Sequence, residues 1–181
     1  MTRLKPVDPA TASGPTKEAL DKIQAKMGRV PNIFTLMGNS SAAVNAYLAM
    51  SEALSHGALD AQMRERIAIS AAEIHHCEYC LSAHTAIAKG VGMSDDEQLK
   101  ARQSQSADAK ADVGLTFVRN ILLRRAEIQD SDIADLHAAG YTDGEIAELI
   151  ANTALNVYTN YFNLIAKTEN DFPKVPLLFP A

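Results

Sequence analysis

The sequence predicts an all-α protein, and three observations lead to this fold class. Alanine, the strongest helix former, is abundant, while aromatic residues make up only 6% of the chain and tryptophan is absent. Apolar residues recur every three or four positions along most of the chain, which is the spacing of one helical face. No stretch alternates apolar and polar residues in the manner of a half-buried strand.

Signals for the start and end of helices divide the chain into its expected elements. Prolines mark residues 1–15 as an extended arm and residues 172–181 as an extended strap. Residues 30–32 are expected to form a linker, and residues 103–112 either a polar connection or the start of a helix. Between the arm and the strap the expected helices begin, in chain order, at Thr16, Ser40 or Ser41, Asp60, Ser94, Val113, Ser131 and Thr142.

Length and charge exclude several classes of function. A chain of 181 residues corresponds to one domain. Its net charge of −5, from 17 basic and 22 acidic residues, argues against non-specific binding to nucleic acid. No apolar run approaches the roughly 20 residues of a membrane span, and residues 1–6 lack the apolar segment of a secretory signal. We therefore expect a single cytoplasmic domain over residues 1–181, with no nucleic-acid or membrane partner.

The chain also carries a weak internal repeat, seen when it is shifted by 83 residues. Such an alignment arises either from a repeated helical hairpin or by chance between Ala-rich helices. If the repeat is real, the second copy, near residues 142–172, keeps the scaffold but lacks cysteine, and its two asparagines are expected to act as helix caps. The superposed pairs include Asp60 with Asp143, Glu65 with Glu148, Cys77 with Asn160, and Cys80 with Asn163.

The chain contains only two cysteines, Cys77 and Cys80, and they lie three residues apart. A loop this short constrains too little of the unfolded chain for a disulfide to hold the fold together. The pair is therefore redox-active, metal-binding or incidental. At the start of a helix, unpaired N–H groups and the helix dipole would stabilise a cysteine thiolate.

A histidine makes the redox interpretation more specific. His84 follows Cys80 by four residues, so Cys77, Cys80 and His84 share one face of a helix. An imidazole in that position can accept the thiol proton and return it to a leaving group.

The carboxylate that best suits this histidine is Glu65. On one continuous helix Glu65 would lie about 18 Å from Cys77, too far to act. A break at residues 75–77 would instead make the flanking helices antiparallel, so that Glu65 could meet His84. The same break would place both cysteines at the start of a helix, so we predict a turn there.

Structural alternatives exist for each of these residues. The cysteines could be buried structural thiols, or they could bind zinc with His84 and either His75 or His76, although ligands spread along one helix seldom surround an ion. Glu65 could belong to a solvated charge cluster, because arginine flanks it on both sides. The expected role of His76 is in the turn and that of Tyr79 is packing, with both kept as candidates that line the site. No metal and no cofactor are expected.

The pattern resembles a known family. The spacing of four residues is similar to the signature of the AhpD-like alkylhydroperoxidases, within the carboxymuconolactone decarboxylase superfamily. In this chain eleven residues separate Glu65 from Cys77, two separate Cys77 from Cys80, and three separate Cys80 from His84. Residues 30–34 and the cysteine-free second half resemble its peroxidase-related subgroup, and the resemblance spans residues 28–172. It implies a helical fold with an internally duplicated hairpin, the CxxC copy lying near residues 60–90. It also implies assembly into trimers or hexamers, and reduction of peroxides by a cysteine pair.

The resemblance also implies a role for each residue. Cys80 would attack the hydroperoxide and become a sulfenic acid, Cys77 would resolve it to a disulfide, and His84 with Glu65 would relay protons. Type members of the family have histidine where this chain has Tyr79. A tyrosine of ordinary pKa, near 10, cannot relay protons at neutral pH, so activity would be weaker or redirected. The helix start favours Cys77 as nucleophile and proximity to the base favours Cys80; we follow the base.

The leading hypothesis is thus an antioxidant, peroxide-reducing dithiol enzyme. Cytosolic buffers keep thiols reduced, so a dithiol partner, lipoyl or thioredoxin-like, would regenerate the pair. The first alternative is a thiol–disulfide redox sensor or interaction protein. The second is decarboxylation of a lactone, which as a cysteine-independent reaction leaves Cys77 and Cys80 unexplained.

Overall fold

The computed structural model describes residues 1–178, and within them the chain forms nine α-helices and no strand. The predicted all-α class is confirmed. Several predicted N-caps are present, with a side-chain oxygen that accepts a backbone N–H in the first turn: these are Ser40, Asp60, Ser94 and Thr142. The helices are α1 Gly14–Met27, α2 Asn32–Met37, α3 Ser41–Ser55, α4 Ala61–Ile74, α5 Glu78–Gly90, α6 Asp95–Arg102, α7 Ala109–Leu123, α8 Asp130–Ala138 and α9 Asp143–Ala166.

Some helix starts differ from the prediction because a cap was misidentified. Helix α1 begins ahead of the predicted Thr16, because Pro15 occupies a first-turn position where a missing N–H has no cost. Helix α7 begins ahead of the predicted Val113, because Asp108 caps it and accepts the N–H of Ala111 in its first turn. The expected linker at residues 30–32 leads directly into the short helix α2.

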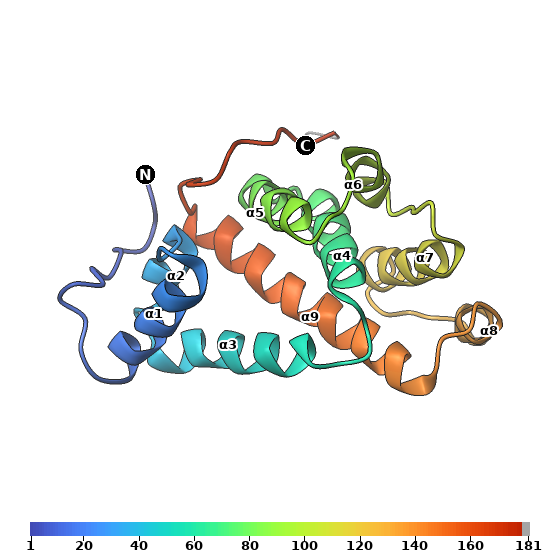
Figure 1. Ribbon diagram of the computed structural model, residues 1–181, viewed down its shortest axis with the longest axis horizontal. Helices are drawn as coiled ribbons and strands as arrows, with labels where there is room; N and C mark the ends of the chain where they lie inside the picture. Colours follow the sequence, from blue (N-terminus) through green and yellow to red (C-terminus); the bar gives the residue numbers. More distant parts are fainter. Residues whose placement is uncertain (179–181) are drawn as a thin grey trace.

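Helix α4 is the element around which the others pack. It contacts α5, α6, α7 and α9, and Figure 1 shows α9 crossing diagonally between α3 and the α4–α5 pair. Two fully buried isoleucines of α4 join different clusters of the core. Ile69 packs with residues of α1, α2, α3 and α5, whereas Ile67 packs with residues of α7, α8 and α9. The position of α4 is thereby set from both sides.

The second copy of the predicted hairpin is not present. Residues 143–166 form one uninterrupted helix, α9, where a repeated hairpin would have turned back on itself. The chain can turn after α4 because His76 adopts a left-handed conformation, with φ of 56°. In α9 the polar side chains instead bond the helix's own carbonyls, Asn156 to Asn152 and Thr159 to Leu155, and the helix continues.

The ends of the chain lie across the helices. In the arm, Arg3 N donates to Ala166 O over 2.8 Å. The strap passes along α5 towards α6 (Figure 1), and Arg102 of α6 donates to Pro176 O over 2.6 Å. Residues 179–181 of the predicted strap lie outside the described residues. No helix within residues 1–178 is both long and apolar enough to cross a membrane.

Candidate active site

The turn between α4 and α5 positions every residue of the candidate site. Helix α4 ends at Ile74, His75 is its C-cap, and Cys77 is the N-cap of α5. Cys77 N donates to Ala72 O over 2.8 Å, the long-range hydrogen bond of a Schellman motif, while His76 occupies the left-handed position. The break therefore falls at residues 75–77, as predicted.

Because α4 and α5 run antiparallel after this turn, Glu65 meets His84. His84 Nδ1 and Glu65 Oε2 lie 2.8 Å apart, and both side chains are largely buried. The flanking arginines point elsewhere, since Arg64 donates to Leu59 O and Arg66 pairs with Glu97 at 2.7 Å. Glu65 is thus a partner of His84 rather than part of a solvated charge cluster.

The two cysteines are joined in a disulfide at the start of α5. Their Cα atoms are 5.3 Å apart, and Cys77 is 1% and Cys80 3% exposed. The backbone N–H of Cys80 donates to Cys77 Sγ over 3.3 Å, so Cys77 caps α5 with its sulfur. Within residues 1–178 no hydrogen bond joins His84 to either sulfur.

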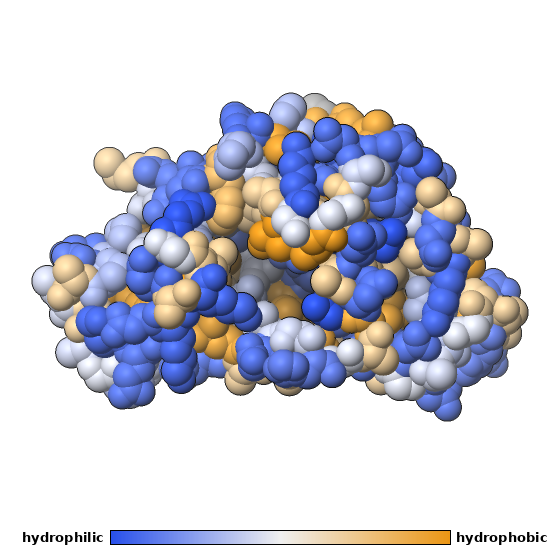
Figure 2. All heavy atoms as spheres, in the orientation of Figure 1, coloured by the Kyte–Doolittle hydropathy of each residue, from blue (hydrophilic) through white to orange (hydrophobic). Residues whose placement is uncertain are grey.

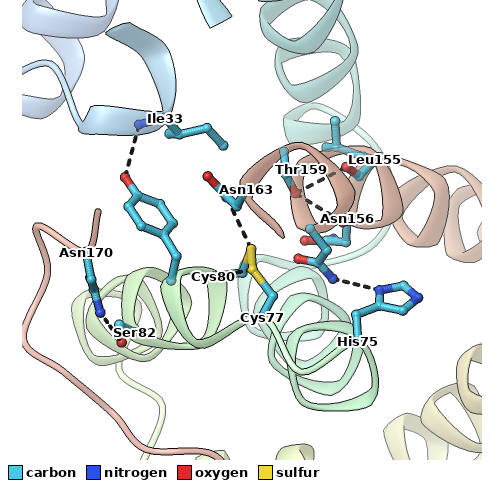
Figure 3. The surroundings of a disulfide bond; sticks show 12 residues. Ile33, His75, Cys77, Cys80, Ser82, Leu155, Asn156, Thr159, Asn163 and Asn170 are labelled. Atoms are coloured by element: carbon cyan, nitrogen blue, oxygen red, sulfur yellow. Dashed lines mark hydrogen bonds between the residues drawn. A yellow bond between two sulfur atoms is a disulfide. The ribbon is translucent and has the colours of Figure 1, made fainter. Parts of the chain in front are cut away.

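Two asparagines of α9 cover the turn. Asn163 Nδ2 donates to Cys80 Sγ over 3.3 Å (Figure 3). Asn160 Nδ2 lies 3.0 Å from His75 Nδ1. Both asparagines lie well inside α9 and are buried, so the expectation that they act as helix caps was wrong.

The side chain of Tyr79 points away from the two cysteine sulfurs. Its hydroxyl donates to Asp171 over 2.8 Å and accepts from Ile33 N over 3.3 Å, while its ring meets Phe172 edge-on. Burial raises the pKa of Tyr79 far above its ordinary value, so its phenol stays protonated. Tyr79 holds the strap against α2 and α5 and cannot relay protons.

The histidines of the turn lie in different environments. His76 is exposed, and its left-handed backbone ends α4. His75 is half-buried against the ring of Tyr161, and burial together with the neighbouring imidazole of His76 lowers the pKa of His75. Within residues 1–178 no cluster of three or more His, Cys, Asp or Glu side chains has the arrangement of a metal site.

A cavity of about 860 Å³ opens beside the His84–Glu65 pair. Figure 2 shows the molecule hollowed near its centre, with apolar residues around the opening. Both Glu65 and His84 line the cavity, whereas neither cysteine does. Its apolar walls come from helices α1, α2, α3, α5 and α9, and include Ile23, Phe34, Leu48, Ile87 and Leu155. The cavity has the size and lining of a site for an organic molecule.

Comparisons with known proteins identify a family that part of the chain resembles and solved structures that share its fold. The model of the carboxymuconolactone decarboxylase family matches residues 41–113. A peroxidase-related protein with an alkylhydroperoxidase AhpD core, from Ralstonia eutropha JMP134, superposes with a TM-score of 0.85 at 21% identity, over 94% of this chain and 92% of that one. A peroxidase-related protein from Silicibacter sp. TM1040 has a TM-score of 0.80 at 25% identity, over 94% and 95% of the two chains. The family match covers residues 41–113, and the chain has the fold of these AhpD-like, peroxidase-related proteins.

The AhpD-like fold accommodates more than one chemistry. A variant of the debrominase Bmp8 in complex with 2,3,4-tribromopyrrole superposes with a TM-score of 0.80 at 16% identity, over 94% of this chain and 92% of that one. No curated protein sequence matches this chain. The fold alone therefore does not select the reaction, and the reaction must be argued from the site.

The position of Tyr79 generates a prediction. Tyr79→Phe removes a hydrogen bond to a carboxylate and leaves Ile33 N without its acceptor, so we expect the free energy of unfolding in urea to fall by about 1–3 kcal/mol. The alkylation rate of the reduced cysteines should stay within about twofold, since the hydroxyl faces Asp171. The control is Tyr161→Phe, whose side chain is exposed. A large change in alkylation with unchanged stability would give Tyr79 a chemical role.

Proposed function

We propose that this protein reduces hydroperoxides with the Cys77–Cys80 dithiol, as an antioxidant enzyme, with His84 and Glu65 as a proton relay. The observation that carries the proposal is the 2.8 Å contact between His84 and Glu65, one helical turn from a cysteine pair at a helix start. A carboxylate bound to one nitrogen of an imidazole orients the ring and supports a positive charge on it during proton transfer.

The reaction consumes one hydroperoxide and two thiols. The Cys80 thiolate attacks the terminal oxygen of R–O–O–H, the O–O bond breaks, and Cys80 becomes a sulfenic acid while the leaving alkoxide takes a proton to give the alcohol. The Cys77 thiolate then attacks the Cys80 sulfur, and hydroxide leaves as water with a second proton. The two thiols thereby give two electrons to the peroxide and are oxidised to the disulfide, and a dithiol reductant returns the pair to thiols.

His84 supplies the protons in this scheme. It follows Cys80 by one helical turn on the same face, which favours Cys80 as the cysteine that meets the peroxide. Because no direct hydrogen bond joins His84 to sulfur in the disulfide form, the proton passes through a water molecule or through the peroxide's own oxygen.

The cavity supports an organic hydroperoxide as substrate. Hydrogen peroxide needs little more room than a water molecule, whereas a cavity of about 860 Å³ with apolar walls can bury an alkyl or aryl group. The acid–base pair on its wall would meet the polar end of such a substrate.

The partners follow from the same chemistry. A small dithiol such as lipoyl, or a thioredoxin-like protein, would reduce the disulfide. Assembly into a trimer or hexamer is supported by an exposed apolar face at the end of α9, where Ile165 is 66% exposed. The other members of this face are Tyr158, Tyr161 and Leu164.

Replacing each cysteine in turn should affect the reaction with peroxide differently. Cys80→Ser should lose peroxide-dependent turnover, because no thiolate remains beside the base, and Cys77→Ser should stop at a sulfenic acid on Cys80. Peroxide consumption with a dithiol reductant, and mass spectrometry after trapping of sulfenic acid, measure the two outcomes. Turnover retained in Cys80→Ser would exclude the proposed reaction, and lactone decarboxylation by the double variant would support the alternative named for the superfamily.

Removal of the carboxylate tests the relay. Glu65→Gln should lower the turnover number by about 10²-fold or more, the usual effect of general acid–base catalysis, because the amide cannot support an imidazolium. The matched control is Glu78→Gln, an acidic residue next to Cys77 whose carboxylate pairs with Lys174 on the surface. Equal losses in the two variants would contradict a specific role for Glu65.

The apolar face of α9 tests the assembly. Ile165→Glu should shift the protein to a smaller species in light scattering, because a carboxylate would be buried without a partner at the interface. The control is Leu123→Glu, an exposed apolar residue at the end of α7. Comparing the mass with and without oxidant also tests the sensor alternative, which requires that the assembly changes when the disulfide closes.

A further inference from the structure

The two sulfurs of the disulfide have different hydrogen-bond donors. Cys77 Sγ accepts the backbone N–H of Cys80, as the cap of α5. Cys80 Sγ accepts from a side chain, the Asn163 amide of α9, at 3.3 Å (Figure 3). Within residues 1–178 no lysine, arginine or histidine side chain hydrogen-bonds either sulfur. The cationic neighbour that usually lowers the pKa of a reactive thiol is thus replaced, at Cys80, by a neutral amide.

Asn163 is an unusual residue at this position. It is 4% exposed, and its Oδ1 is buried with no hydrogen-bond partner in the described chain. A buried amide with one unsatisfied end costs folding free energy that an apolar side chain of similar volume would not. Packing therefore does not explain the residue, whereas its contact with the redox-active sulfur does.

An amide can serve both protonation states of a thiol. With Nδ2 towards the sulfur, as in this structure, it donates to a disulfide sulfur or a thiolate. After a half-turn about its last side-chain bond, Oδ1 would face the sulfur and accept from a thiol S–H. An aspartate could only accept and would repel a thiolate, and a leucine could do neither.

Other titratable groups near the pair lie on α4, α5 and the strap. His75 lies at the end of α4, where it contacts Asn160, and Glu65 of the same helix pairs with His84 of α5. Asp171 of the strap is held by Tyr79 and Arg29. Each has a partner of its own, so none takes the place of Asn163 at Cys80.

We propose that Asn163 is a catalytic residue that stabilises the Cys80 thiolate through its side-chain amide. The inference rests on the proposed dithiol function and adds a residue to it. Without Asn163 the helix start would favour Cys77, because within residues 1–178 a backbone N–H donates to the Cys77 sulfur and none to the Cys80 sulfur. The amide gives Cys80 a comparable donor, so the cysteine closer to His84 can be the nucleophile, and can also leave as a thiolate when the disulfide is reduced.

The test measures the pKa of Cys80 without any peroxide. A Cys77→Ser background leaves one thiol and keeps an oxygen at the cap position of α5. Thiolate absorbance near 240 nm and the rate of alkylation by iodoacetamide, each against pH, report the pKa. Asn163→Leu should raise it by about 1–2 units, the shift that corresponds to a hydrogen bond to a charged group. Asn163→Asp should raise it further, because a carboxylate repels the thiolate.

The control is Asn120→Leu, which replaces another buried asparagine, bonded to Asp132 on the far side of the core. It should leave the pKa of Cys80 unchanged. An Asn163→Leu protein that folds and keeps the parent pKa would overturn the inference, even if Asn163→Asp shifted it. If Asn163→Leu does not fold, the nearly isosteric Asn163→Asp variant provides the test. An unchanged pKa of Cys80 in that variant would overturn the inference. Since no step uses peroxide, failure of the peroxidase proposal would be seen separately, in turnover.

Discussion

The left-handed turn between α4 and α5 is the constraint on which the rest of the site depends. His76 adopts a backbone conformation that costs free energy for a residue other than glycine, and it is held there by the hydrogen bond from Cys77 N to Ala72 O. One continuous helix would leave Glu65 several turns from the cysteines. The turn reverses the chain, so Glu65 faces His84 and the cysteines acquire a helix start.

Helix α9 converts this turn into an enclosed site. Its long buried face is polar where it covers the turn, with Asn160 against His75 and Asn163 against Cys80. A purely apolar face would leave the buried sulfur of Cys80 and the half-buried imidazole of His75 without these hydrogen-bond partners. The polar face is therefore explained by the turn that it covers and not by the stability of α9 itself.

Contacts with the strap hold the Tyr79 side chain away from the two cysteine sulfurs. Where type members of the resembled family have a histidine between the cysteines, Tyr79 donates a hydrogen bond to Asp171 and its ring meets that of Phe172 edge-on. Its burial raises the pKa of Tyr79 and keeps the phenol protonated, so Tyr79 cannot act as a base at neutral pH. The substitution therefore leaves the helix start intact while it removes one group that could relay protons.

Much of this protein is determined by the sequence alone. Helical periodicity and caps predict the all-α class and most helices, because both signals are local, and the spacing of Glu65, Cys77, Cys80 and His84 predicts the turn. Only the tertiary structure decided that residues 143–166 run straight and that Asn163 reaches Cys80. Neither could be read from local signals, since an asparagine within a helix has the same propensity whether it faces solvent or a sulfur. Which of the two it meets depends on how α9 packs against a turn 83 residues earlier in the chain.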